Sequence, residues 1–463
     1  MLRRAFDEWE RIDACPVVLD IIRYGNKLPL YQIPDVIVLG NNKSARDNAL
    51  FVRNEILSLL EKRCISEVTV RPRVINPLTV AGNTKKLRLV LDCRHVNPCL
   101  HKFRFRFEDS AVALELLRKG DWLFSFDLKS AYHHIEIFSD HREYLGFSWD
   151  FVGVTKYFVL NVLPFGLSTA GYVFSKVTRE LIEYWRSKGH KVIMYLNDGL
   201  GGHGLQEQAL KLSNEVKVDL NRFGFLIADE KCSWKPCLEA DWLGLVWKMG
   251  EGKVYITEKR LSKLECSLRA VLASQGGDAK GVTARALAGV VGQIISMKVG
   301  IGPVTRLMTR YMYANVLAKA SWDSRIYITS DALFEVRFWL ENVRSLNGRV
   351  IEQPKSHDVA VFSDASGIGY GGYMLNVNDS EVLGVWSEAE KAESSTWREL
   401  EAVRRMMRTY DESLVGHCLV GRKVLWYTDN QNVASILVNG SKKCRLHAQA
   451  RDVFGMCSEK TSS

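Results

Sequence analysis

Strand-like and helix-like patterns of apolar residues alternate along the first half of the chain. Residues 121–127 and 156–163 alternate apolar and polar positions, as a half-buried strand does. The apolar run 192–196 predicts another strand, and Asn197 and Asp198 follow it in a tight turn that leads into a further strand. A basic hairpin is expected within residues 68–97. The pattern predicts a mixed α+β fold for this part of the chain.

Helices are expected between these strands. Apolar residues recur at helical spacing over residues 44–61, with Ser44 as the expected N-cap. A second helix should begin after Ser168 or Thr169, and a third should span residues 205–223. The expected buried stripe of the second helix contains Phe174, Val177, Leu181 and Tyr184 or Trp185.

The chain divides by pattern into four segments. Residues 1–60 form a lead-in, and residues 61–256 carry the strands and helices above. Residues 257–353 turn helical. Strands return in residues 354–463, which we expect to be a second α/β domain. The apolar stripes expected in the helical segment are Leu261, Leu264, Leu268 and Val271, and later Phe334, Phe338 and Val343.

Composition narrows the class of partner. The 463 residues are 47% hydrophobic with a formal net charge of +10, which favours a globular protein with an anionic partner such as nucleic acid. The ten cysteines lack CxxC spacing, so they are expected to be free thiols. The sequence has neither an apolar leader nor a long apolar run. We therefore expect an intracellular protein of the cytoplasm or nucleus, without a transmembrane segment.

Two aspartates at strand ends suggest metal chemistry. Joining two nucleotides uses two divalent cations about 4 Å apart, so carboxylates must converge from separate strands. Asp127 and Asp198 follow such strands. A single aspartate at the end of a strand is usually a turn cap. A metal-binding role for these two aspartates therefore depends on the motifs that surround them.

The chain carries the segments FDLKSAYHH at 126–134 and LPFGLSTA at 163–170. These segments resemble the reverse transcriptases of retroelements. They are most similar to those of DIRS-type retrotransposons, with gypsy-type LTR elements next. The resemblance runs from about Tyr31 to the end. It implies a right-hand polymerase of the α+β multi-domain class, with fingers and palm in 61–256, a helical thumb and connection in 257–353, and a C-terminally incomplete RNase H-like domain in 354–463.

The resemblance also implies roles for individual residues. Asp127 and Asp198 would bind metal, and Lys231 would protonate the leaving pyrophosphate. The backbone of Ser130 and Ala131 would face the incoming triphosphate. Tyr132 would exclude a 2′-hydroxyl by its bulk. The remaining implied contacts are Arg88 with Lys86 or Lys85 on the triphosphate, Phe165 beside the templating base, and Gly166, which would let the primer backbone come close.

One position departs from the family pattern. The family has Tyr-x-Asp-Asp, whereas this chain has Tyr195-Leu196-Asn197-Asp198. An amide oxygen can touch Mg²⁺ but brings no charge, so a loss of about 3–5 kcal/mol, or roughly 10²–10⁴ in rate, is expected. Asn197 is then a degenerate metal ligand, and polymerase activity should be weak or absent. Sequence error and decay of a mobile element each explain the substitution.

The last domain resembles RNase H, in which four carboxylates bind two Mg²⁺. Asp364, Glu399 and Asp429 match three of them, and the fourth is expected beyond Ser463. The implied cofactor is Mg²⁺, two per active site, with Mn²⁺ as a substitute. The implied partners are an RNA or DNA template, a DNA primer, an RNA–DNA hybrid and deoxynucleoside triphosphates. Two alternatives stay open: a non-catalytic nucleic-acid-binding pseudoenzyme, and a hybrid ribonuclease whose C-terminus is completed.

Overall fold

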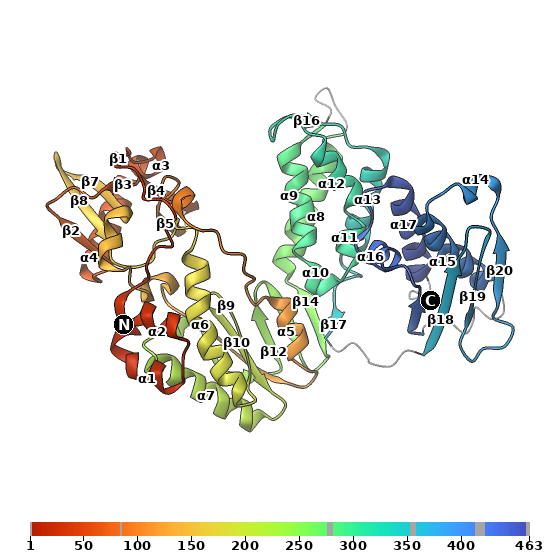
Figure 1. The fold of residues 1–463 in the computed structure, drawn as a ribbon, viewed down its shortest axis with the longest axis horizontal. Coiled ribbons are helices and arrows are strands. Elements are labelled where there is room, and N and C mark those ends of the chain that lie inside the picture. The colour runs from red at the N-terminus through yellow and green to blue at the C-terminus, as the bar shows by residue number, and fades with distance from the viewer. Residues whose placement is uncertain (1, 84–85, 276–280, 352–357, 413–421, 460–463) are drawn as a thin grey trace. The chain divides into compact units, whose positions relative to one another are not determined.

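The computed structural model describes all residues except 1, 84–85, 276–280, 352–357, 413–421 and 460–463. The chain divides into two compact units, residues 1–243 and 244–463 (Figure 1). Among the described helices, none is both long and apolar enough to cross a membrane.

A four-stranded antiparallel sheet forms the centre of the first unit. Its order is β11 (Ser233–Cys237), β6 (Trp122–Asp127), β10 (Asp198–His203) and β9 (Lys191–Tyr195). Helices α6 (Ala170–Ser187) and α7 (Gln206–Arg222) pack on one face of this sheet (Figure 1). The predicted stripe of α6 is confirmed, because Phe174, Val177, Leu181 and Trp185 are fully buried.

Glycines in β10 make room for two phenylalanine rings of β6. Phe124 and Phe126 point to the helix-covered face and are buried. A Cβ at Gly199 would lie 2.1 Å from the ring of Phe126, its cross-strand partner. Side chains alternate along a strand, so the residues that flank these phenylalanines lie on the opposite face. Asp127 is one of them.

A second sheet and a hairpin complete the strands of this unit. The five-stranded sheet has the order β1, β3, β7, β8, β2, and the separate hairpin β4–β5 is the predicted basic one. Their bounds are β1 (Ile37–Val38), β2 (Ile65–Val68), β3 (Val74–Ile75), β4 (Leu78–Asn83), β5 (Lys86–Leu91), β7 (Gly146–Phe151) and β8 (Val154–Leu160), and β12 (Glu239–Trp242) follows β11.

The predicted helix at 44–61 is interrupted. It consists of α3 (Lys43–Asp47) and α4 (Ala49–Glu61), which meet at Asn48. The prediction that Ser44 caps it is wrong, because Ser44 lies inside α3 and its hydroxyl accepts the N–H of Val80 at 3.1 Å. The shorter elements are η1 (Leu2–Ala5), α1 (Phe6–Arg11), α2 (Pro16–Tyr24), η2 (Asn97–Cys99), α5 (Ser110–Leu116), η3 (Ala131–His134), η4 (Ser139–Leu145) and η5 (Asp229–Lys231).

The second unit begins with the hairpin of β13 and β14, and a mostly helical region follows from α8 onward. Leu261, Leu264, Leu268 and Val271 are buried, but Phe334 is 49% exposed, so the second predicted stripe is partly wrong. Ala332, Val336 and Trp339 form the buried face instead. The elements are β13 (Leu245–Lys248), β14 (Lys253–Ile256), α8 (Glu258–Ala273), β15 (Val282–Thr283), α9 (Ala284–Ile295), α10 (Lys298–Ile301), α11 (Val304–Leu307), α12 (Arg310–Leu317), β16 (Arg325–Ile326), α13 (Ser330–Asn342) and β17 (Arg349–Val350).

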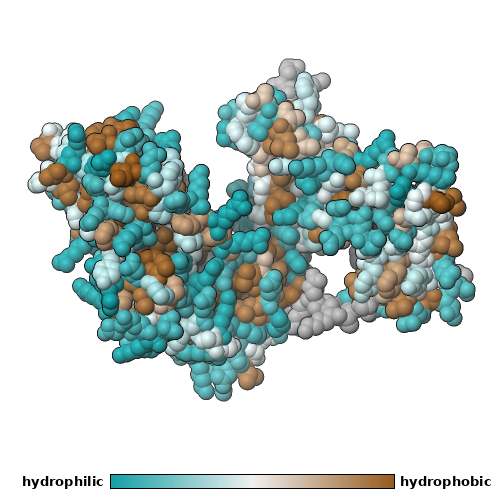
Figure 2. Space-filling view, in the orientation of Figure 1, coloured by the Kyte–Doolittle hydropathy of each residue, from teal (hydrophilic) through white to brown (hydrophobic). Residues whose placement is uncertain are grey.

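A four-stranded sheet follows, with strand order β20, β19, β18, β21. β18 pairs antiparallel with β19 and parallel with β21. One face packs on α15, and Figure 2 shows exposed apolar side chains along edge strand β20, where Leu383 is 82% exposed. The elements are β18 (Val359–Ala365), β19 (Gly369–Met374), β20 (Val382–Val385), α14 (Glu388–Lys391), α15 (Ser395–Glu412), β21 (Val424–Tyr427), α16 (Gln431–Asn439) and α17 (Cys444–Glu459).

Candidate active sites

The two strand-end aspartates of the first unit are direct neighbours. Asp198 begins β10 and Asp127 ends β6, and the antiparallel register pairs them. Residues paired in this way have Cβ atoms about 4.5–5.5 Å apart and point to the same face. Both carboxylates therefore lie on the sheet face that α6 and α7 leave uncovered.

Three side chains hold Asp127. Asn197 Nδ2 donates to one carboxylate oxygen at 3.0 Å, and Lys231 Nζ donates to the other at 3.1 Å. The Asp127 N–H donates to Cys232 Sγ at 3.3 Å. Asp127 itself is 9% exposed. In this arrangement Asn197 acts as a hydrogen-bond donor to a metal-ligand candidate, a role that an aspartate could not take in its ionised form.

Asp198 is held in an environment that disfavours its charge. Burial, followed by the hydrogen bond and charge of the Asp127 carboxyl, raises the pKa of Asp198 to about 6. Lys231 acts in the opposite direction. A cation bound between the two carboxylates would relieve both the repulsion and the desolvation, so this donor pair fits a divalent metal ion.

The turn before Asp198 is strained. Tyr195 and Asp198 are paired, so the loop between β9 and β10 has only two residues, and Leu196 adopts a φ of 54°. A leucine rarely occupies this left-handed region. The Asn197 carbonyl accepts the N–H of Leu128 at 2.9 Å, which ties the tip of the turn to the residue after Asp127.

Several candidate nucleotide-binding residues follow β6 closely along the chain. Ser130 has a φ of 54° and precedes η3, which carries Ala131 and Tyr132. The half-buried Tyr132 ring lies 5.1 Å from the ring of Phe165. A cavity of about 180 Å³ is lined by Arg88, Ser130 and Phe165 together with mostly apolar residues. Lys86 begins β5, and Lys85 lies outside the described residues.

The close approach at Gly166 is to the protein itself. Gly166 has a φ of 107°, and a Cβ there would lie 1.9 Å from the carbonyl oxygen of Leu91. The Leu91 N–H also donates to the Phe165 carbonyl at 3.1 Å. The glycine is thus required to dock this loop on β5, whether or not a primer backbone also approaches it.

The two adjacent histidines, His133 and His134, lie in the short helix η3. His134 is buried, its Nδ1 lies 2.9 Å from the Ala131 carbonyl, and its Nε2 accepts the Leu226 N–H at 2.8 Å. Burial lowers the pKa of His134 to about 4. His134 is therefore a neutral structural residue that fixes the loop after Asp127.

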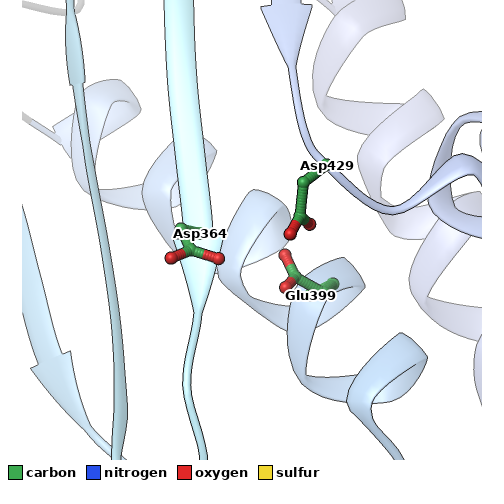
Figure 3. Close-up of side chains that lie close together, drawn as sticks. All are labelled: Asp364, Glu399 and Asp429. Carbon is green, nitrogen blue, oxygen red and sulfur yellow. The ribbon is translucent and has the colours of Figure 1, made fainter.

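A second carboxylate cluster lies in the second unit. Asp364 on β18, Glu399 on α15 and Asp429 just after β21 each offer an oxygen atom within 4.8 Å of the others (Figure 3). Glu399 is 4% exposed, and its Oε2 has no hydrogen-bond partner in the described part of the chain. Burial, then Asp429 and Asp364, raises the pKa of Glu399 to about 7. The orphaned oxygen and the clustered charge fit a divalent cation.

A cavity of about 620 Å³ adjoins this cluster. Asp364 and Asp429 line it together with the rings of Phe362, Tyr373 and Tyr427. The Phe362 ring stacks on Tyr427 at 4.6 Å between centroids. The carboxylates therefore face an open space bordered by aromatic rings.

The sequence analysis overlooked a basic and aromatic segment near Asp198. Phe103 stacks on Tyr172 at 4.5 Å, and the Phe107 ring lies 5.4 Å from that of Tyr195. The intervening Arg104 and Arg106 are exposed. The alternation in Lys102–Phe107 was the available signal, because such spacing puts rings on one side of an extended chain and charges on the other.

Two antiparallel strand ends present a pair of carboxylates on the uncovered sheet face, an arrangement that could bind the metal ions of phosphoryl transfer. The chain matches the family model "Reverse transcriptase (RNA-dependent DNA polymerase)" over residues 62–247. Residues 62–247 therefore carry a reverse transcriptase domain of the kind found in retroelement polyproteins, and the reverse transcriptase family comprises RNA-directed DNA polymerases.

Similar polyproteins come from viruses and a transposon. The genome polyprotein of Petunia vein clearing virus (isolate Shepherd) is 27% identical over 146 residues, which is 32% of this chain and 6% of that protein. The Pol polyprotein from transposon 412 of Drosophila melanogaster is 26% identical over 165 residues, 35% of this chain and 13% of that protein. The chain thus matches only a small part of each relative. The retroelement assignment is confirmed, and the DIRS subtype stays a prediction.

Solved structures share the fold. A foamy viral protease–reverse transcriptase in complex with double-stranded DNA superimposes with a TM-score of 0.59 at 15% identity, covering 92% of this chain and 71% of that one. That structure is of the form designated dRH, and the foamy viral protease–reverse transcriptase in complex with an RNA/DNA hybrid gives a TM-score of 0.58 at 15% identity, covering 92% of this chain and 54% of that one. The predicted mixed helix-and-sheet polymerase fold is confirmed.

Proposed function

We propose that this chain is a retrotransposon reverse transcriptase whose polymerase centre is weakened by Asn197. The observation that carries the proposal is the register pairing of Asp127 with Asp198, with Asn197 bonded to the first of them. The family assignment supports the reaction class, and the site geometry supports the loss of activity. The substrates would be an RNA or DNA template, a DNA primer and deoxynucleoside triphosphates.

Asp127 and Asp198 would hold Mg²⁺, with Asn197 as a poor third ligand. Two Mg²⁺ ions, when bound, would activate the primer 3′-oxygen and neutralise the triphosphate. Lys231, 51% exposed at its side chain, can release Asp127 and turn toward the leaving pyrophosphate as a proton donor. To bind metal through the Asn197 oxygen, the amide must rotate and give up its hydrogen bond to Asp127.

The residues around the cavity would select and orient the nucleotide. Arg88 is exposed on β5 and, with Lys86, would pair with triphosphate oxygens. The Ser130 and Ala131 backbone would face the same phosphates. Tyr132 is buttressed by Phe165 and by Phe174 at 5.9 Å, so its ring cannot easily yield to a 2′-hydroxyl.

Primer extension tests the polymerase proposal. Extension on an RNA template with Mg²⁺ should be weak for the natural chain and rise about 10²–10⁴-fold in Asn197→Asp, because a charged ligand is restored. Asn197→Gln is the matched control and should stay weak. Robust extension by the natural chain, unchanged by Asn197→Asp, would contradict the weakened site. Nucleic-acid binding without extension in either form would favour a non-catalytic pseudoenzyme.

A second candidate function is hydrolysis of RNA paired to DNA. It is favoured by the Asp364, Glu399 and Asp429 cluster, whose buried Glu399 oxygen lacks a partner among the described residues. The strand order, in which β21 at one edge of the described sheet pairs parallel with β18, suits the RNase H-like fold that we propose for residues 354–463. These three residues would hold Mg²⁺ or Mn²⁺, and a fourth carboxylate beyond Ser463 stays an expectation.

Hybrid cleavage tests this second function independently of the first. A labelled RNA–DNA hybrid should be cut with Mn²⁺ by a chain extended at its C-terminus by the adjoining reading frame, and Glu399→Gln should abolish the cut. The polymerase variant Asp198→Asn is the control and should leave cleavage intact. Cleavage that survives Glu399→Gln would contradict the proposed site.

A further inference from the structure

Two neighbouring cavities open between α12 and the loop that joins α16 to α17. Their volumes are about 320 and 150 Å³, and both are lined by Arg310, Tyr313 and Lys442. The larger also contains Arg306 and Asn439. Among the described residues, no carboxylate lines either cavity. We call the two cavities together the basic groove.

The cationic groups of the basic groove are not neutralised by the protein. Arg306 and Lys442 are exposed, and Arg310 is half-buried. Within the described ranges, none of the three forms an ion pair with a carboxylate. Arg306 Nη1 donates only to the neutral side chain of Asn439, at 3.1 Å. Three such charges on separate segments repel one another unless an anion lies between them.

Two side chains of the groove also carry buried nitrogen atoms that lack partners among the described residues. Arg310 Nε and both ring nitrogens of His447 have no hydrogen-bond partner in the part of the chain that the structure describes. His447 is 1% exposed and lines the smaller cavity. A buried polar group without a partner costs about 1–3 kcal/mol, so its retention calls for a compensating ligand.

The carboxylate of Glu335 lies near His447 and is already engaged by two backbone N–H groups. Glu335 Oε1 lies 3.8 Å from His447 Nε2, beyond hydrogen-bond distance. Its two oxygens accept the N–H groups of Tyr311 and Met312 at 3.0 and 2.8 Å. Glu335 is fully buried and caps the first turn of α12. The open side of the groove is therefore left with positive charge.

We propose that the basic groove binds the phosphodiester backbone of a nucleic-acid strand. The proposal rests on the proposed function, because that function supplies such strands. Arg306, Arg310 and Lys442 would contact phosphates, and Arg310 Nε would gain the acceptor that it lacks. The ring of Tyr313, 42% exposed, would pack against a sugar or base edge. This contact is independent of the carboxylate clusters and would hold the strand without reading its sequence.

The salt dependence of binding tests the groove. Affinity for double-stranded DNA would be measured across a chloride series for the natural chain and for Arg310→Gln/Lys442→Gln. Each lost phosphate contact lowers the slope of log affinity against log salt by about 0.9, so the pair should lower it by about 1.8. At 0.1 M salt this corresponds to roughly 60-fold weaker binding. Lys263→Gln/Arg269→Gln, both exposed on α8, is the charge-matched control.

Each outcome is decisive. If the salt slope of the Arg310→Gln/Lys442→Gln variant falls no more than that of the control, the groove does not bind the strand. If the natural chain binds no duplex at all, the proposed function itself is contradicted. Lys442→Gln alone removes an exposed residue and should lower the slope by about 0.9 even if the double variant folds poorly. Inorganic phosphate at matched ionic strength should compete no better than chloride. If phosphate competes better than chloride, the groove binds a free anion and the proposal of a nucleic-acid strand is contradicted.

Discussion

Asn197→Asp should destabilise the first unit in the absence of metal. The substitution removes the 3.0 Å hydrogen bond from Asn197 Nδ2 to Asp127 and places a third carboxylate beside Asp127 and Asp198. It would do so at a turn already strained by the φ of 54° at Leu196. The natural amide, by contrast, stabilises the metal-free site.

The magnitude follows from two contributions. A hydrogen bond to a charged group is worth about 1.5–3 kcal/mol. Two like charges near 4 Å repel by up to about 4 kcal/mol at an effective dielectric constant of 20, and Lys231 and solvent offset much of this. We expect the free energy of unfolding to fall by about 2–4 kcal/mol at pH 7.5.

Thermal and urea unfolding in EDTA and in Mg²⁺ measure this effect. Asn197→Asp should unfold earlier than the natural chain in EDTA and recover in 10 mM Mg²⁺, because bound cation neutralises the added charge. Asn197→Ala is the control, since it loses the hydrogen bond without adding charge and should not recover with Mg²⁺. Equal stability of Asn197→Asp and the natural chain in EDTA, or no response to Mg²⁺, would refute the reasoning.

Three further predictions concern single residues. Glu399→Gln should raise the stability of the chain at pH 8 but not near pH 4. The pKa of Glu399 is raised to about 7 in the folded chain, so the natural chain loses stability as the pH rises from the pKa of the unfolded state through 7. A Tm difference between the two chains that does not depend on pH would contradict this. Gly166→Ala should lower the unfolding free energy by more than about 3 kcal/mol, since its Cβ would lie 1.9 Å from the Leu91 carbonyl, and a wild-type urea midpoint would disprove the clash. In the Asn197→Asp background, Tyr132→Ala should admit ribonucleotides at least tenfold better in primer extension, and unchanged sugar discrimination would exclude the gate.

Structural features that depend on one local sequence pattern could be predicted from the sequence. The strand ends at Asp127 and Asp198, the α6 stripe and a tight turn at Asn197 were predictable, because alternation and turn length fix register. The turn itself consists of Leu196 and Asn197, one residue earlier than predicted. The cluster of Asp364, Glu399 and Asp429 was predicted from the order of the family motifs. Sequence spacing alone could not predict it, because a parallel strand pair brings Asp364 and Asp429 together from distant parts of the chain.

Other features depend on tertiary contacts that no local pattern encodes. Ser44 has a cap-like position, but its hydroxyl bonds β4 instead. Phe334 looks like a core residue, yet it is half exposed beneath the guanidinium of Arg451, 4.9 Å from its ring. The donor role of Asn197 could not be predicted, because it depends on the contact between its amide nitrogen and the Asp127 carboxylate. The basic groove is invisible in sequence because Arg310 and Lys442 are far apart along the chain.

The most direct test of the shared centre is extension by Asn197→Asp with and without a second substitution, Asp198→Asn. The two aspartates are register partners on one sheet face, so removing Asp198 should lower Mg²⁺-dependent RNA-templated extension of the restored chain by at least about 10³-fold, with template binding unchanged. Extension that survives Asp198→Asn would show that Asp127 and Asp198 do not act on one metal site, and would contradict the account.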